Sequence, residues 1–575
     1  MGLPMDEFPV RRSFQHFRLA KMKLANLRQI SLCEKKARIF TIGLFTLVFF
    51  VTNIWLARFD VEGFHDGYSL APAIAVSEGL IPNRDVSYIY GFLSPLIQGF
   101  WLKLTGATLL NLRLLNAILV TFNFALSLLV LSRRWSLSLS ALAVSCVAFA
   151  YTSILPAMIP WPSVLLNTII VILVYFHTSK RDHEYLQPHI LWSVTGFLLS
   201  TAFFLRIHAI FIVLLLALCL FLNKNFSSLL NFIVSFLSTS VLYMLILGTF
   251  GALPDFVKDV FLYPRELYEN EAVPWQSHLV NLFLLLSYFG FLLLLLGIHF
   301  LQRIALDRSS RNSSLVPLLT TTVTFIVTFL SYQFGSGVEQ IPVNQRSFLN
   351  FEYFTRYFAQ NMRFLLAYSL AAFLIYSCIR ILINGQIRKK PNLVVPFAFS
   401  IGSLAQLLPS PDYLHLWWIS PVLIMCIPFF FDGKITDSLV WKAVLLGVLF
   451  TNLIFLHSTL SQNRSYIKDT VARGMYGLSS QIPDSDLLES LRAIDKFFVE
   501  EKGYFHCRMG IYSVANGDFL SKTRDFVSWG FQTQDKVDLP GLHFFCDSEL
   551  SPLSNKEKLI WVGSSSRDFI LRREK

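Results

Sequence analysis

Residues 39–57 read IFTIGLFTLVFFVTNIWLA, nineteen consecutive residues without a charged side chain. A helix needs about 20 mostly apolar residues to cross the hydrocarbon core of a bilayer, so this stretch predicts a membrane span. The segment before it, residues 1–38, carries nine Lys and Arg residues. Because that basic segment is long and no small-residue cleavage site follows the apolar run, we expect a retained anchor rather than a cleaved signal peptide.

The same apolar pattern recurs along the chain. Of the 575 residues 54% are hydrophobic, 55 are Phe and only 15% are charged, whereas soluble domains have roughly 25% charged residues. This excludes a disordered chain, a disulfide-stapled secreted domain and an ordinary soluble enzyme. Further spans are expected at 110–131, 137–156, 161–177, 190–205, 208–222, 228–250, 279–301, 314–333, 361–383, 393–409, 416–431 and 438–457. A backbone in lipid must satisfy its own hydrogen bonds, so these runs predict thirteen transmembrane helices.

The distribution of positive charge predicts the orientation of the spans. With the N-terminus in the cytoplasm, the cytoplasmic segments hold 21 Lys and Arg residues and the outer loops hold eight. An excess on the cytoplasmic side is what the positive-inside rule requires, and thirteen spans then put the C-terminus outside the cytoplasm. The net charge of +12 therefore reflects membrane topology. A nucleic-acid partner is not expected, because it would need a basic stripe on one face of a soluble domain.

The chain divides into a basic N-terminus (1–38), a transmembrane domain (39–458) and a charged tail (459–575). In the tail, Ser485 or Asp486 is placed to cap a helix. The apolar face of that helix would contain Leu487, Leu488, Leu491, Ile494, Phe497 and Phe498. Strand-like runs follow at 505–514, 525–531, 543–546, 559–562 and 569–572, which predicts a small extracytoplasmic α+β domain. Cys507 and Cys546 lie in this tail, either as a disulfide or as two buried thiols.

The first outer loop, residues 58–109, is far too long for a simple connector. Its stretches 68–79 and 91–106 predict helices lying along the membrane surface. The carboxylates of the chain gather in the outer loops and are nearly absent from the middle of the spans. A transporter coupled to protons or sodium is expected to bury carboxylates near the midplane. The pattern therefore favours a reaction at the outer membrane face, and no nucleotide-binding or zinc-protease motif is present.

Three segments of this loop form a recognisable pattern: FHDGY (64–68), EGLIPNRD (78–85) and YGFLSPL (90–96), after which Asn111 and Arg113 begin the next span. The pattern resembles the first outer loop of the GT-C superfamily of membrane glycosyltransferases. The nearest likeness is to the protein-mannosyltransferase and aminoarabinose-transferase branch and its bacterial relatives. FLRIH (204–208) and PDYLH (411–415) resemble later elements of the same proteins. The resemblance implies an all-α GT-C fold that uses a polyprenyl-phosphate sugar.

The resemblance assigns the catalytic acid of the family to Asp66. An inverting transfer needs a base that takes the proton of the acceptor as it attacks the anomeric carbon, so we expect Asp66→Asn to abolish transfer. The leaving lipid phosphate needs cations, and we assign Arg206 with His208 to hold it near the rim. Two structural alternatives stay open, in which Asp66 only caps a helix and Arg206 is a rim cation whose charged end extends to water.

Asp85 is assigned to acceptor positioning or to a second catalytic acid, and its alternative is a turn residue. Arg84 and Tyr90 are assigned to substrate binding, although Tyr is also common as an anchor at the membrane interface. Asp412 and His415 either orient a substrate or bracket the start of a helix. The outer loop 251–278 is either a lid over acceptor or lipid or a solvated loop.

No cofactor is required by this chemistry, and no metal ligand is assigned. His65 and His208 together with Asp66 leave a divalent metal open, but three scattered residues are weak evidence for ligation. Many members of the superfamily have Asp-Glu where this chain has Asp66-Gly67, so a second carboxylate for a metal is absent at that position.

The sequence predicts an integral glycosyltransferase of the plasma (inner) membrane. It would move a sugar from a polyprenyl-phosphate donor to a lipid, glycan or protein acceptor of the cell envelope, by an inverting mechanism. The alternatives are an oligosaccharide polymerase or ligase at the same membrane face, a transporter of lipid-linked glycans, and a non-catalytic assembly subunit. A ligase would need arginine-rich outer loops, and a transporter would be expected to show internal repeats; the chain has neither.

Overall fold

A computed structural model describes the parts of the chain that carry the fold. It covers residues 36–58, 63–150, 158–178, 187–262, 390–407, 413–430 and 439–461, short pieces between 322 and 387, and in the tail residues 465–466, 479–480, 485–497, 504–506, 541–545, 557–562 and 569–573. Everything below concerns these residues.

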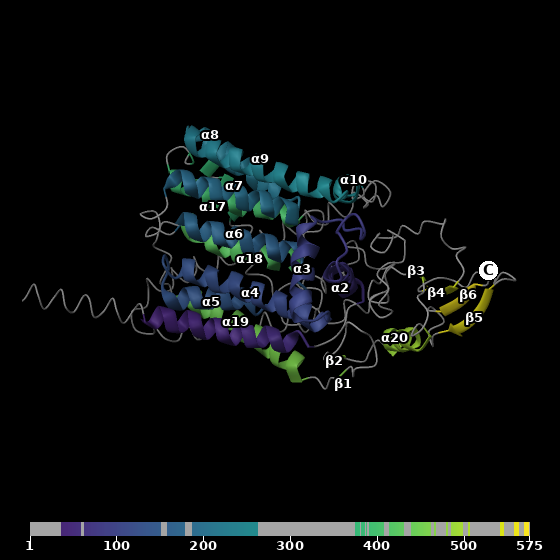
Figure 1. Ribbon diagram of the computed structural model, residues 1–575. Coiled ribbons are helices and arrows are strands. Elements are labelled where there is room, and N and C mark those ends of the chain that lie inside the picture. The colour runs from purple at the N-terminus through teal and green to yellow at the C-terminus, as the bar shows by residue number, and fades with distance from the viewer. Residues whose placement is uncertain are drawn as a thin grey trace, which may run out of the picture.

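The body of the protein is a bundle of apolar helices that run side by side (Figure 1). It begins with the helix Lys36–Leu56. The helices that follow are α4 (Leu109–Leu131), α5 (Leu137–Ala148), α6 (Pro162–Thr178), α7 (Pro188–Leu205), α8 (Ala209–Leu222), α9 (Phe226–Thr249), α17 (Val394–Leu404), α18 (Tyr413–Cys426) and α19 (Leu439–Ser461). Local signals set some of the starts, since the Thr108 side chain caps α4 and the Asn225 side chain caps α9.

The helices match the apolar windows of the sequence. Within the described residues a helix stands at every expected span except 361–383, which is described only in pieces. The window 279–301, and the window 314–333 apart from Thr322, fall outside the described part. Four helices, Lys36–Leu56, α4, α7 and α9, are long and apolar enough to cross a membrane. The helix α5 ends at Ala148, before the expected end at 156. Thirteen spans and a cytoplasmic N-terminus stay predictions.

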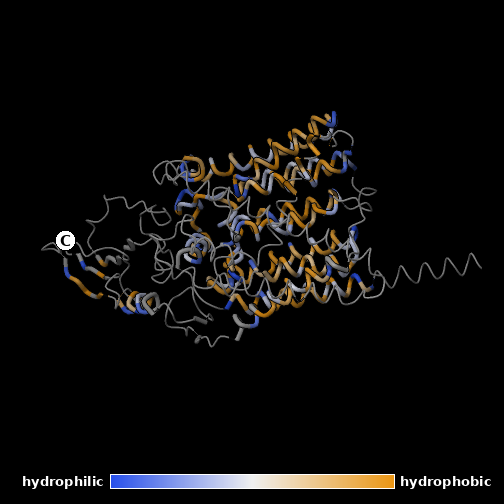
Figure 2. The backbone as a smooth tube through the Cα atoms, turned by 180° about the vertical axis from the view of Figure 1, so that it is seen from behind, coloured by the Kyte–Doolittle hydropathy of each residue, from blue (hydrophilic) through white to orange (hydrophobic). Residues whose placement is uncertain are grey.

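The outer sides of the bundle are apolar. Figure 2 shows hydrophobic positions along the outer helices, and α9 exposes Leu230, Val234, Leu237 and Val241, each more than half accessible. A soluble monomer rarely presents an apolar surface this extensive. Lipid is the environment in which such a surface is stable, so the packing supports an integral membrane protein.

Small residues bring the helices close together. A Cβ added at Gly196 of α7 would overlap the Phe232 carbonyl oxygen of α9, and one added at Gly402 of α17 would lie 2.7 Å from the Ile212 Cα of α8. In lipid, close backbone approach at small residues is a main source of helix–helix stability. The α7–α9 and α8–α17 contacts therefore depend on these glycines.

The first outer loop forms a cap across one end of the bundle. Its two helices, α2 (Gly63–Ser77) and α3 (Leu93–Thr105), stand where surface helices were expected, and Figure 1 shows α3 crossing the ends of the bundle helices. The Trp101 indole N–H donates to the Asn111 carbonyl at 2.7 Å, and the Asn111 amide donates to the Thr105 and Gly106 carbonyls. These bonds fix the angle between α3 and α4.

A second outer segment packs against the same cap. After α9 the chain forms the short helix α10 (Leu253–Val257) and one turn of π-helix, Lys258–Leu262. Phe256 meets Phe92 and Phe204 edge-on or tilted, at centroid distances of 6.0 and 5.7 Å. This aromatic contact holds α10 against the first outer loop and the end of α7.

The tail contains the helix α20 (Ser485–Phe497) and short strands. The strand β3 (Tyr504–His506) pairs in parallel with β4 (Gly541–Phe545), and β6 (Phe569–Arg573) pairs antiparallel with both β4 and β5 (Glu557–Val562). A separate hairpin joins β1 (Ser465–Tyr466) to β2 (Ser479–Ser480). The expected strand at 525–531 and both Cys507 and Cys546 lie outside the described residues. That the tail is an extracytoplasmic domain of its own stays a prediction.

Candidate functional site

A buried ion pair lies at the capped end of the bundle. Asp66, in the first turn of α2, and Arg113, in α4, are both fully buried, with Arg113 Nη2 2.6 Å from Asp66 Oδ2. Arg113 Nη1 also donates to the Ala57 carbonyl at 3.2 Å. The guanidinium therefore ties together the end of the first helix, α2 and α4. It also offsets the large cost of burying a negative charge.

The structure does not support the alternative in which Asp66 only caps a helix. The helix α2 begins at Gly63, so Asp66 is not its capping residue. A carboxylate in the first turn is still favourable there, because it faces the positive end of the helix dipole. Its partner Arg113, however, belongs to another helix, 47 residues later in the chain.

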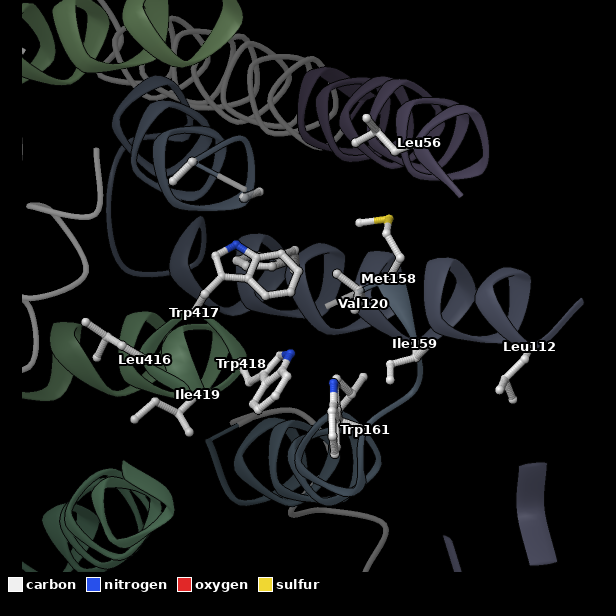
Figure 3. Close-up of a cluster of buried hydrophobic side chains, with 14 of the residues drawn as sticks. Leu56, Leu112, Val120, Met158, Ile159, Trp161, Leu416, Trp417, Trp418 and Ile419 are labelled. Carbon is white, nitrogen blue, oxygen red and sulfur yellow. The ribbon is translucent and has the colours of Figure 1, made fainter. Parts of the chain in front are cut away.

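Next to this pair is a group of rings that we call the aromatic cluster: Tyr68, Tyr88, Tyr90, Trp161 and Trp418. Tyr68 stacks on Trp161 at a centroid distance of 5.8 Å and meets Tyr90 edge-on at 5.9 Å. Figure 3 shows Trp161, just before α6, beside Trp418 of α18, and their centroids are 5.5 Å apart. Segments far apart in sequence thus meet in a single set of rings.

The three phenols of the cluster stay neutral at physiological pH. Burial raises the pKa of Tyr68 well above its ordinary value, and the neighbouring Tyr90 and Tyr88 raise it further. Burial also raises the pKa of Tyr88 and of Tyr90, and the nearby Arg206 only partly opposes this. Neutral phenols donate as well as accept hydrogen bonds, so they suit phosphate oxygens and sugar hydroxyls.

Arg206 lies at the edge of the aromatic cluster. Its side chain is 4% exposed, with the guanidinium carbon 5.7 Å from the Tyr90 ring centroid. Arg206 Nε donates to His208 Nδ1 at 3.3 Å, and Nη2 donates to the Gln406 carbonyl at 3.5 Å. The expected alternative of a rim cation reaching into water is therefore wrong, because the side chain turns inward to these partners.

Tyr90 and Gly91 connect the outer loop to Arg206. The Gly91 N–H donates to the Leu205 carbonyl at 3.2 Å, which places the loop directly beside the residue preceding Arg206. Tyr90 packs on Tyr68, Tyr88, Trp161 and Arg206. It therefore belongs to the site, and the alternative of an anchor in the membrane interface is not supported.

Asp85 and Arg84 form a turn at some distance along the same loop. Arg84 Nε and Nη2 each lie 2.8 Å from an oxygen of Asp85, and the Ile81 N–H donates to Asp85 Oδ2 at 2.9 Å. Arg84 holds the pKa of the Asp85 carboxyl below its ordinary value. Arg84 is exposed and also donates to the Phe250 carbonyl. These contacts favour the structural role of Asp85 and leave its catalytic role without support.

The remaining expected residues are described only in part. His415 meets the Trp418 ring edge-on at 5.0 Å, so it borders the aromatic cluster. Asp412 and the side chain of His65 lie outside the described residues, as does loop 263–278. Within the described part, no three His, Cys, Asp or Glu side chains gather in a way that suits a metal ion.

Sequence reasoning missed two members of this site, because Trp161 and Trp418 had no assigned role. Trp161 stands between Pro160 and Pro162 at the start of a span, a signal that this ring is held rigidly at a helix entrance. No local pattern distinguishes Trp418, because aromatic residues make up 15% of the chain.

The arrangement combines three chemical functions at one end of an apolar bundle. A buried carboxylate is paired with a guanidinium, a set of rings is suited to pack on the faces of a sugar, and a second buried guanidinium is suited to an anion. The carboxylate and one ring, Asp66 and Tyr68, come from the same helix turn. A transfer reaction whose donor releases an anionic leaving group would use the carboxylate, the rings and the guanidinium.

Comparison with known proteins gives a remote structural likeness. No protein-family model matches the sequence, and no curated protein matches it. Among solved structures, the chain is similar to ArnT from Cupriavidus metallidurans bound to undecaprenyl phosphate, with 12% sequence identity and a TM-score of 0.44. The match covers 93% of this chain and 97% of that one. At this level of similarity, function has to be argued from the residues themselves.

Proposed function

We propose that this protein is an integral membrane glycosyltransferase. It moves a sugar from a polyprenyl-phosphate donor to an acceptor at the outer face of the membrane, with inversion at the anomeric carbon. The observation that carries the proposal is the convergence of the buried Asp66 carboxylate, the aromatic cluster and the buried Arg206 at one end of a lipid-facing bundle.

The roles follow from the chemistry of each group. Arg206, with His208 beside it, binds the phosphate of the donor, and Tyr90 packs between that phosphate and the sugar. His208 Nδ1 accepts a hydrogen bond from Arg206, so the neutral imidazole carries its proton on Nε2, the atom that would donate to a phosphate oxygen. Arg113 keeps the Asp66 carboxylate in place and compensates its charge.

The transfer step balances without a further reactant. An acceptor hydroxyl attacks the anomeric carbon from the face opposite the phosphate, and its proton passes to the Asp66 carboxylate. The anomeric carbon–oxygen bond breaks, and its electron pair leaves with the polyprenyl phosphate. Arg206 stabilises the charge on that leaving group in a site with little water, where such an interaction is strongest.

Transfer in proteoliposomes tests the proposal. Purified protein is given a panel of radiolabelled polyprenyl-phosphate sugars together with a membrane-envelope extract as the source of acceptors. Label that moves from one donor to an extract component, with release of polyprenyl phosphate, supports the proposal. Binding of the lipids without transfer from any donor would contradict it and favour the ligase or assembly-subunit alternatives.

Arg206→Gln is expected to weaken binding of undecaprenyl phosphate, used here as the probe for the donor. A hydrogen bond to a charged group contributes about 1.5–3 kcal/mol, so the dissociation constant should rise about 10- to 100-fold. Titration of the intrinsic tryptophan fluorescence measures this, because Trp161 and Trp418 lie in the cluster. The exposed cation Lys103 provides the matched control, and an Arg206→Gln variant that binds as tightly as Lys103→Gln would contradict the assignment.

A further inference from the structure

Asp259 is a buried carboxylate that the proposed mechanism does not use. It lies in the π-helical turn Lys258–Leu262 and is 4% exposed. Its Oδ2 accepts a hydrogen bond from Asn83 Nδ2 at 3.1 Å and from the Tyr88 N–H at 3.3 Å. Both donors belong to the first outer loop, more than 170 residues earlier in the chain.

Those two donors hold the part of the loop that leads into the aromatic cluster. Asn83 has a positive φ of 64°, a backbone conformation that Asn adopts more readily than most residues. Its amide also donates to the Tyr88 carbonyl at 2.9 Å, and its N–H donates to the Val86 carbonyl. Asn83 therefore closes the loop on itself, and Asp259 fastens the closed loop to the second outer segment.

The loop is held from the other side at Gly91, which bonds to the Leu205 carbonyl. Tyr88 belongs to the attachment at Asp259 through its N–H, and Tyr90 lies between Tyr88 and Gly91. The segment 83–91 is thus held by the Asp259 carboxylate at residues 83 and 88 and by a backbone bond next to Arg206 at residue 91. Movement of either attachment would move the two tyrosines relative to that guanidinium.

We infer that Asp259 is a positioning residue for the donor site, which acts by fastening the Asn83–Tyr88 turn so that Tyr88 and Tyr90 stay beside Arg206. This inference rests on the proposed function, because it names the part of that site on which Asp259 acts. Asp259 itself touches neither sugar nor phosphate. Its effect is transmitted through the backbone N–H of Tyr88 and the side chain of Asn83.

The energetics make Asp259 difficult to replace. One carboxylate oxygen serves two donors, and hydrogen bonds to an ionised acceptor are roughly twice as strong as neutral ones. Asp259→Ala leaves the Asn83 amide and the Tyr88 N–H facing an apolar gap, which costs more than losing an exposed hydrogen bond. The exchanged pair Asn83→Asp/Asp259→Asn keeps a donor opposite an acceptor between residues 83 and 259 but loses the side-chain bond from residue 83 to the Tyr88 carbonyl, so we expect it to restore only part of the lost order.

Hydrogen exchange of the peptide covering residues 81–92 tests the contact without reference to activity. The experiment uses the full chain in detergent, with Asp259→Ala, the exchanged pair and Asp255→Asn as the matched control in the same outer segment. We expect faster exchange in Asp259→Ala, partial recovery in the exchanged pair and no change in Asp255→Asn. Wild-type exchange in Asp259→Ala would overturn the fastening role.

Donor kinetics then test what the contact is for. For a donor that the wild type accepts, Asp259→Ala should raise the KM for the donor about 10- to 100-fold, as expected when the displaced tyrosines lose one hydrogen bond to a charged group of the donor. The kcat at saturating donor should change far less. Faster exchange with an unchanged KM, or an equal loss in Asp255→Asn, would overturn the positioning role.

The inference and the proposed function fail in different ways. If the wild type transfers no sugar, the proposed function is lost, and binding of undecaprenyl phosphate replaces transfer as the readout of positioning. An Asp259→Ala variant that exchanges faster and binds this lipid as tightly as the wild type would then count against the inference. An affinity that falls in Asp259→Ala and partly recovers in the exchanged pair supports it.

Discussion

Arg113→Gln is expected to destabilise the protein by about 3–5 kcal/mol, because removing one partner of a buried ion pair leaves the other charge uncompensated. Asp66 and Arg113 are both fully buried and are joined at 2.6 Å. The substitution also removes the bond to the Ala57 carbonyl, so the first helix, α2 and α4 lose their common partner. Thermal unfolding in detergent measures the loss.

The double variant Asp66→Asn/Arg113→Gln tests whether the loss of stability in Arg113→Gln comes from the uncompensated charge of Asp66. It replaces both charges by neutral amides, so neither partner is left as the uncompensated buried charge that makes a single replacement costly. We expect it to recover most of the stability that Arg113→Gln loses. An Arg113→Gln variant as stable as the wild type would show that the ion pair does not hold these helices together.

Gly91→Ala is expected to disrupt the junction between the first outer loop and α7. A Cβ at this position would overlap the Phe204 carbonyl group and lie 2.9 Å from the Leu205 carbonyl carbon. These are backbone atoms at the end of a helix, so they cannot move aside as a flexible side chain would. The loop must lift away, which breaks the Gly91–Leu205 hydrogen bond and separates Tyr90 from Arg206.

Undecaprenyl phosphate binding and thermal unfolding measure the effect of Gly91→Ala. We expect affinity to fall at least tenfold, as for the loss of a hydrogen bond to a charged group, together with a clear loss of stability. Gly43→Ala is the matched control, because no atom lies within 4 Å of a Cβ at that position in the first helix. Gly91→Ala behaving like Gly43→Ala would contradict the close approach.

The features that depend on local sequence were predictable. Uninterrupted apolar windows marked the helices of the bundle, and polar breaks within residues 58–109 marked α2 and α3 as a separate pair. Glycine in the Tyr90-Gly91 motif also has a local reading, since only a residue without a side chain fits against another backbone. The resemblance to GT-C proteins pointed to the same loop.

The contacts that build the site were not predictable from local pattern. Asp66 meets Arg113 across 47 residues, and Arg206 meets the Gln406 carbonyl across 200. The packing of the helices decides which aromatic rings contact one another. In a chain with this many aromatic residues, the local sequence does not indicate these pairs. Asp259 points to the first loop from a π-helical turn, a local geometry that hydrophobic periodicity does not reveal.

Burial explains why the structural alternatives for Arg206 and Asp66 are not supported. A cation at the end of a span is usually expected to reach for water, yet Arg206 has a ring, an imidazole and a carbonyl within reach inside the protein. The structural alternative for Asp66 was a cap at the start of its own helix, but the carboxylate pairs with a buried guanidinium, which is the stronger partner. Partners from segments distant in sequence therefore determine the orientation of both side chains.

Sugar transfer by the double variant Asp66→Asn/Arg113→Gln tests the central claim most directly. This variant is expected to fold and to bind undecaprenyl phosphate through Arg206, but it lacks the carboxylate that accepts the proton of the acceptor. We predict wild-type binding of that lipid with no detectable transfer from a donor that the wild type uses. Transfer at a rate near that of the wild type would show that the Asp66–Arg113 pair only stabilises the fold, and the proposed mechanism would be wrong.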